Sequence, residues 1–121
     1  VRALGAALAD EDTCVRRMAA RLFGRVQHAS ALGILTRRLE DRDERTRQMA
    51  AVALGHLDDH EAVEELIAVI EDRVAAVRAA ATWALGEIED ERAVTALTRR
   101  LEDDPDPFVR RQAAWALGNM Y

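Results

Sequence analysis

A segment of twelve residues recurs four times along the chain at an almost constant spacing. Its copies occupy residues 15–26, 46–57, 77–88 and 109–120. The copy at 77–88 reads VRAAATWALGEI, and the glycines of the four copies stand at 24, 55, 86 and 118, in steps of 31, 31 and 32 residues. A fixed period in this range is typical of stacked repeats, in which each unit contacts mainly its neighbours. The sequence therefore predicts a repeat array.

A second segment lies between these copies and carries a helical pattern. Its apolar positions are 32, 35 and 39, then 63, 66 and 70, then 94, 97 and 101. This i, i+3, i+7 spacing is that of a helix with one buried stripe. Val1, Leu4 and Leu8 repeat it, so residues 1–9 are expected to form a further copy of this helix. The chain is predicted to be all-α, an α-solenoid of antiparallel helix pairs with about eight helices.

The repeats predict one domain over residues 1–121. Its units are a partial repeat at 1–26 and repeats at about 27–57, 58–88 and 89–120. Neither end of this array reads as the polar cap that such arrays need for solubility. Either the sequence is a fragment of a longer solenoid, or it associates end to end with another copy.

The sequence also predicts which residues cap the helices. Asp59, Asp90 and Asp106 each precede a helix and are expected to cap it, with Pro107 in the first helical position. His28 occupies the equivalent place in the first repeat, which predicts the least secure turn there.

Arginine recurs at 16, 47, 78 and 110, and Asp41, Asp72 and Asp103 recur just ahead of three of these helices. We expect a structural ladder of Arg–Asp contacts between repeats. The four repeated glycines lie within helical patterns, where each costs about 1 kcal/mol relative to Ala. Their repetition predicts the close approach of a neighbouring helix.

The pattern resembles HEAT-like repeats, specifically the short repeats of the phycobilin-lyase type. The resemblance covers essentially the whole chain and rests on VRxxAxxALGxI at 77–88, DERAV at 90–94 and LxxxLED at 97–103. It implies the α-solenoid fold, but such arrays serve as scaffolds, adaptors and parts of enzymes alike.

Helical phase divides the first helix of each repeat into two faces. Val77, Ala81 and Leu85 share one sector, and Trp83 points roughly opposite. In the HEAT-like family this second face lines the concave surface, where partners bind. Carried over by position, the predicted partner-binding row is Arg17, Met18, Arg21, Arg25, Gln48, Met49, Val52, His56, Ala79, Ala80, Trp83, Glu87, Arg111, Gln112, Trp115 and Asn119. Exposed Trp, Met and Arg are enriched in binding hot spots, although either tryptophan could instead pack against a neighbouring helix.

No catalytic residue, cofactor or metal site is predicted. His56 and His60 flank a turn without sharing a helical face, and a structural site needs about four convergent ligands, so a solvated turn is favoured. Cys14 has no histidine placed by the sequence to activate it. HEAT-like deoxyhypusine hydroxylases bind two irons through His-Glu pairs in the concave helices. The corresponding pairs at 17–18, 48–49, 79–80 and 111–112 contain no His-Glu, which excludes that activity.

The leading hypothesis is a non-enzymatic scaffold that binds another protein or a peptide on the predicted row. A phycobilin-lyase-like or light-harvesting-associated module is the enzymatic alternative that the resemblance implies. A nucleic-acid-binding HEAT-like domain is a further alternative, against which the net charge of −5 argues. No apolar run approaches the length of about 20 residues that a membrane span needs. The single cysteine is compatible with a reducing cytoplasm, where we expect the protein to reside.

Overall fold

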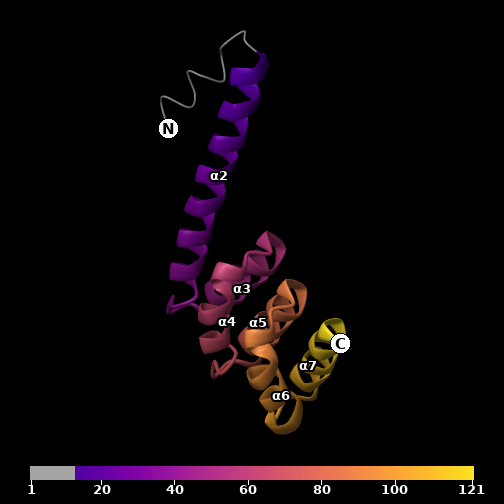
Figure 1. Cartoon of the computed structure of the whole chain (residues 1–121). Helices are drawn as coiled ribbons and strands as arrows, with labels where there is room; N and C mark the ends of the chain where they lie inside the picture. The colour runs from indigo at the N-terminus through magenta and orange to yellow at the C-terminus, as the bar shows by residue number, and fades with distance from the viewer. Residues whose placement is uncertain (1–12) are drawn as a thin grey trace. The chain divides into compact units, whose positions relative to one another are not determined.

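The computed structural model describes the backbone of residues 13–121, with the side chains of residue 22 and of residues 25–121. Every regular element in this part is helical (Figure 1). The helices are α2 (Thr13–Arg38), α3 (Glu44–Leu57), α4 (Val63–Val69), α5 (Ala75–Ile88), α6 (Val94–Asp103) and α7 (Pro107–Met120), with 3-10 turns at His60–Ala62 and Glu91–Ala93. The all-α class is confirmed, whereas the helix predicted at 1–9 lies outside the described residues. Over the described range, the helices are too short or too polar to cross a membrane.

Helix α2 differs from the expectation. We predicted two helices with a turn at His28, but α2 continues unbroken from residue 13 to residue 38. At the matching turn after α3, Asp58 adopts left-handed backbone and Asp59 caps the next element. Gln27 and His28 stand at these two places in α2. Because Gln is a good helix former and His is a poor N-cap, the local sequence does not stop the helix, and the predicted turn was wrong.

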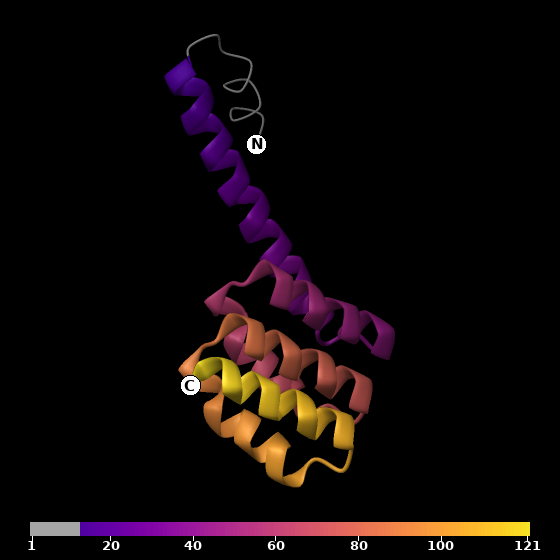
Figure 2. The ribbon, with the colours of Figure 1, turned by 90° about the vertical axis from the view of Figure 1, so that its right-hand side faces the viewer.

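Contacts divide the chain into two compact units, residues 1–33 and residues 34–121, and the second is described below. It consists of two layers of helices. In the first layer α3, α5 and α7 lie side by side, as Figure 2 shows. In the second layer α4 packs against α5, and α6 packs against α7. This alternation confirms the α-solenoid arrangement, while one domain over residues 1–121 stays a prediction.

Most positions of the predicted buried stripes are buried, but Leu101, predicted in the stripe of α6, is 36% exposed near the end of that helix. On α5, Val77 and Leu85 are fully buried, and in the second layer Leu66, Ile70 and Leu97 are buried as well. Burying an aliphatic side chain of this size contributes roughly 1.5–3 kcal/mol. These side chains therefore hold the two layers together.

The predicted helix caps are confirmed. Asp59, Asp90 and Asp106 each accept a hydrogen bond from the backbone N–H two residues later, at 2.8, 2.9 and 2.8 Å respectively. Pro107 begins α7, where its missing N–H leaves no bond unmade. Asp59 and Asp90 cap the 3-10 turns that lead into α4 and α6, whereas Asp106 caps α7 directly.

The backbone at the C-terminal end of α5 is strained. Glu89 has a φ of 58°, and its N–H donates to the carbonyl of Leu85 at 3.0 Å. Left-handed backbone strains an L-residue by about 1–2 kcal/mol, and glycine is the preferred residue at this place. We therefore expect Glu89→Gly to raise the free energy of unfolding by about 1 kcal/mol in urea denaturation.

The matched control is Glu87→Gly, two residues earlier and inside α5. Glu87 is exposed and helical, so glycine there should lower the free energy of unfolding by about 1 kcal/mol. Equal losses for Glu87→Gly and Glu89→Gly would contradict the left-handed assignment.

Two of the repeated glycines bring the first-layer helices close together. A Cβ atom on Gly55 would lie 2.5 Å from Cζ3 of Trp83, and one on Gly86 would lie 2.7 Å from Cζ3 of Trp115. The predicted close approach is confirmed at these two positions. Gly118 differs, because a Cβ there would meet nothing within 4 Å.

An arginine ladder joins neighbouring repeats. The guanidinium of Arg47 donates to both carboxylate oxygens of Asp72, at 2.8 and 3.3 Å. Arg78 donates in the same way to Asp104, at 2.8 and 3.2 Å. The ladder is confirmed at these two rungs with one correction, since the acceptor of the second is Asp104 and not the predicted Asp103. The side chain of Arg16 lies outside those that the structure describes. Asp103 is exposed at the end of α6, and the extra residue of the 32-residue step moves the acceptor one place along the chain.

Asp104 is a buried carboxylate held by cations. Its side chain is 0% exposed, and Arg100 also donates to it at 3.2 Å. Burial alone would raise the pKa of Asp104. The hydrogen bonds from Arg78 and from the N–H of Asp106, together with the charges of Arg78 and Arg100, outweigh burial and lower that pKa below its ordinary value. The carboxylate therefore stays charged in the folded protein at neutral pH.

Candidate functional site

A groove crosses the first layer of helices. Its volume is about 520 Å³, and residues of α3, α5 and α7 form it together with the cap of α7. The residues that line the groove are Gln48, Val52, His56, Ala75, Ala76, Ala79, Ala80, Trp83, Asp106, Phe108 and Gln112.

Alanines of α5 form the floor of the groove. Ala79 and Ala80 are each 7% exposed, whereas Ala76, one turn earlier, is exposed. Because alanine carries only a methyl group, α5 leaves room between the larger side chains of α3 and α7. The alanines in the first half of α5 therefore produce the hollow.

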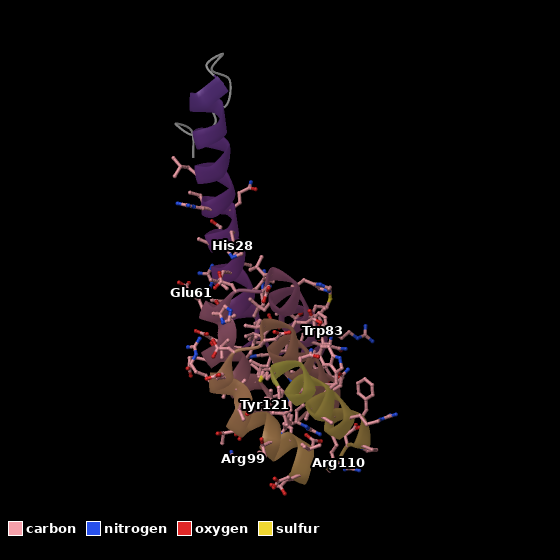
Figure 3. The ribbon with its side chains drawn as sticks, turned by 45° about the vertical axis from the view of Figure 1, so that its right-hand side comes forward. His28, Glu61, Trp83, Arg99, Arg110 and Tyr121 are labelled. Carbon is pink, nitrogen blue, oxygen red and sulfur yellow. The ribbon has the colours of Figure 1, made fainter. Side chains whose placement is uncertain are left out.

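Trp83 forms the wall next to α3 (Figure 3). Its Cζ3 atom occupies the space above Gly55, and its ring centroid lies 5.0 Å from that of His56, at an interplanar angle of 59°. The indole is half-buried. One edge of the ring thus packs on a neighbouring helix, and the side chain also lines the groove. The role of Trp83 in binding a partner stays a prediction.

Phe108 forms the opposite wall, in the first turn of α7. Its side chain is 50% exposed, and the guanidinium of Arg111 lies 5.9 Å from the ring centroid, within the range of a cation–π contact. The cap by Asp106 fixes this turn through the N–H of Phe108. An exposed aromatic ring is therefore held in place at the rim.

Sequence reasoning missed four residues that line the groove: Ala75, Ala76, Asp106 and Phe108. The predicted row begins one turn inside each helix, so it left out the first turns and the cap. A signal for Phe108 was present, because it precedes Gln112 by four residues and so shares its helical face.

The structure brings part of the predicted row together. The predicted residues that line the groove are Gln48, Val52, His56, Ala79, Ala80, Trp83 and Gln112. Met49 is 71% exposed and lines a neighbouring hollow on α3, and Arg111 lies over the aromatic ring of the rim. Glu87 is exposed on α5. Trp115 and Asn119 contact α5 outside the groove, the ring by packing and the amide by a hydrogen bond of 3.4 Å to a carbonyl. Their role in binding a partner stays a prediction.

The first part of the predicted row falls in the other unit. The side chains of Arg17, Met18 and Arg21 lie outside those that the structure describes, and Arg25 is exposed on α2. These four residues stay a prediction.

Polar side chains of the turn after α3 contact those of the turn after α5. Nδ1 of His60 lies 2.9 Å from a carboxylate oxygen of Asp90, and Arg92 donates to the same oxygen at 2.8 Å. The bonds from Arg92 and, to a smaller extent, from His60 hold the pKa of Asp90 well below its usual range. Among the described side chains, those of residues 22 and 25–121, no three His, Cys, Asp or Glu gather closely enough to hold a metal ion.

Comparisons with known proteins agree with this architecture. A family model described as HEAT repeats matches residues 1–75 and 54–118. Among solved structures, the chain is similar to human deoxyhypusine hydroxylase in complex with glycerol, with a TM-score of 0.66 and 22% identity over 98% of this chain. The chain spans 42% of that structure's length. At this identity the likeness shows the fold alone, and comparison with curated proteins found no match.

Proposed function

The chain belongs to the HEAT-repeat family, and from that premise we propose that it is a non-enzymatic scaffold whose groove holds a segment of another protein. The observation that carries the proposal is the groove across α3, α5 and α7, which combines an apolar floor with two aromatic walls, Trp83 half-buried and Phe108 exposed. Its volume of about 520 Å³ lies within the range of about 300–1,000 Å³ found for ligand pockets.

The walls of the groove suit apolar anchors of a partner. Trp83, Phe108 and Val52 offer aromatic and aliphatic surface that is partly exposed to solvent. Tryptophan is enriched among residues whose truncation strongly weakens binding, and such residues cluster in well-packed pockets. A large apolar side chain that enters between Trp83 and Phe108 would cover this surface.

The rims of the groove suit a peptide main chain. Gln48 on α3 and Gln112 on α7 line the groove on its two sides, and among the described residues neither amide makes a hydrogen bond. Each primary amide has two donors and one acceptor group, so it can bond the N–H and the C=O of an extended segment. An apolar partner with an accessible main chain therefore fits better than a highly charged one.

The similarity to a hydroxylase does not alter the proposal. The positions where the resemblance implies His-Glu pairs are occupied by Arg17 and Met18, by Gln48 and Met49, by two alanines, and by Arg111 and Gln112. These side chains lack the imidazole and carboxylate ligands that iron centres of that kind use.

A display experiment with random peptides tests the proposal. Peptides selected on the 121-residue chain should bind it, and Ala76→Glu should weaken their binding by about tenfold or more, since the longer side chain fills the groove. The substitution suits the fold, because Ala76 is exposed in the first turn of α5, where a carboxylate is favourable.

The control is Ala68→Glu, the same change at an exposed alanine of α4 in the other layer. It should leave peptide affinity unchanged in titration calorimetry. Selected peptides that bind Ala76→Glu as tightly as the unmodified chain would overturn the assignment of the groove.

A further inference from the structure

The groove lies above the middle one of the three first-layer helices. Its floor is α5, which has α3 packed on one side and α7 on the other. All the residues that line the groove belong to the unit at 34–121. The hollow is therefore formed between neighbouring repeats inside the array.

A carboxylate without a cation lines this groove. Among the described residues that line it, Asp106 is the only Asp, Glu, Lys or Arg, and it is half-buried. Its Oδ1 atom accepts the N–H of Phe108 at 2.8 Å. No cation among the described side chains pairs with Asp106, although Asp72, Asp90 and Asp104 each pair with an arginine. The groove thus contains a negative charge that lacks a positive partner.

The matching cap on α3 shows that the arginine ladder does not use this carboxylate. Asp43 is the N-cap of α3, as Asp106 is of α7. Another repeat follows α3, yet among the described side chains the carboxylate of Asp43 bonds only the N–H of Arg45, at 2.9 Å. The rungs use Asp72 and Asp104 instead. The contacts between repeats therefore leave the charge at this cap position free for another role.

The two aromatic walls of the groove can contact a cation as well. The face of an aromatic ring is partly negative, and it attracts a Lys or Arg within about 6 Å of the ring centroid. Phe108 makes one contact of this kind, with Arg111 at 5.9 Å. Trp83 lines the other wall, and tryptophan gives the strongest contacts of this type. Rings and carboxylate together suit a side chain with an aliphatic stem and a cationic end.

The unit that contains the groove is acidic as a whole. Residues 34–121 include 19 Asp and Glu but 12 Arg and no Lys, which gives a net charge of −7. A surface of this charge speeds the approach of cationic partners and slows that of anionic ones. The overall charge and the charge inside the groove therefore favour the same kind of occupant.

We propose that the occupant of the groove is an apolar segment of another protein that carries one lysine or arginine. The assignment rests on the proposed function and adds the charge of the bound segment to it. The aliphatic stem of the cation packs between Trp83 and Phe108, and its charged end meets the carboxylate of Asp106. Apolar neighbours of the cation cover the alanine floor, while Gln48 and Gln112 bond the main chain.

A double-mutant cycle with display-selected peptides tests the contact at Asp106. Peptides selected on the 121-residue chain should contain a Lys or Arg whose replacement by Gln weakens binding by about tenfold in titration calorimetry. Asp106→Asn should weaken binding of the original peptides by a similar factor, because it removes the charge while Asn remains a good N-cap. Against Asp106→Asn, replacing the cation should cost little more, since the two charges act as a pair.

The matched control is Asp43→Asn, the same change at the cap of α3, outside the groove lining. It alters the net charge equally and should change peptide affinity by less than about twofold. Thermal melting followed by circular dichroism shows whether both variants are folded. Equal losses for Asp43→Asn and Asp106→Asn, or selected peptides that bear Asp and Glu in place of a cation, would overturn the proposal.

A neutral variant that fills the groove separates this proposal from the one on which it rests. Ala76→Leu leaves the charge unchanged and should weaken binding by about tenfold or more, whatever the charge of the peptide. Peptides that are blocked by Ala76→Leu but insensitive to Asp106→Asn would keep the groove as the binding surface and overturn only the cation. A library that yields no binder, or peptides insensitive to both variants, would overturn both proposals.

Discussion

Asp104→Ala is expected to lower the free energy of unfolding by about 3–5 kcal/mol, because it leaves buried cations without their counter-charge. The carboxylate accepts from Arg78 at 2.8 Å and from Arg100 at 3.2 Å, and its side chain is 0% exposed. It also accepts the N–H of Asp106, which in turn caps α7. Chemical denaturation measures the loss, which should be the largest among single aspartate substitutions in the unit at 34–121.

The neighbouring aspartate provides the control. Asp103→Ala removes an exposed carboxylate, and exposed substitutions of this kind change stability by about 0.5 kcal/mol or less. If the two alanine variants lost equal stability, the assignment of the second rung to Asp104 would be wrong.

The dependence of the free energy of unfolding on pH in the acidic range provides an independent test of the role of Asp104. Its pKa is lowered in the folded protein, so the unfolded chain takes up the proton first as the pH falls. The stabilisation is therefore complete above the unfolded pKa of about 3.9 and is lost as the pH falls through the lower, folded value. The difference in free energy of unfolding between the unmodified chain and Asp104→Ala should be constant near neutral pH and shrink below about pH 4.

Gly86→Ala is expected to destabilise the chain by about 1–3 kcal/mol, although alanine is the better helix former. The new methyl group would lie 2.7 Å from Cζ3 of Trp115, 2.8 Å from Cβ of Ala116 and 3.0 Å from its Cα. The aromatic edge could shift, but the backbone of α7 cannot move without disturbing the buried Ala116. Thermal melting followed by circular dichroism measures the effect.

Gly118→Ala is the matched control, with the same change at the same position of the next repeat. A Cβ there meets nothing within 4 Å, so only helix propensity acts, and the variant should be more stable by up to about 1 kcal/mol. Changes of the same sign in both variants would contradict the close approach of α5 and α7.

Repetition made much of the fold predictable. The apolar stripes, the aspartate caps and the arginine ladder recur at matching positions of the later repeats, so their roles could be predicted there from more than one copy. The helical phase also placed Trp83 of α5 and Gln112 of α7 on the faces that line the groove. Within each helix, side chains four residues apart share a face.

Features that depend on a single repeat were not predictable in this way. The turn expected at His28 failed because that repeat lacks the aspartate that stops the helix elsewhere. The choice of Asp104 over Asp103 follows from where α6 ends, since Asp104 turns to extended backbone, with ψ at 131°. Phe108 belongs to the groove because Pro107 and its cap fix the first turn of α7, a local geometry that the repeat pattern does not contain.

The binding role of the groove is tested most directly by the indole N–H resonances of the chain, which contains two tryptophans. Trp83 lines the groove, whereas Trp115 packs over Gly86 outside it. Addition of a display-selected peptide to ¹⁵N-labelled protein should shift the Trp83 indole resonance and leave that of Trp115 in place, with Trp115→Phe supplying the assignment. A shift confined to Trp115, or no shift of either resonance at saturating peptide, would contradict the account.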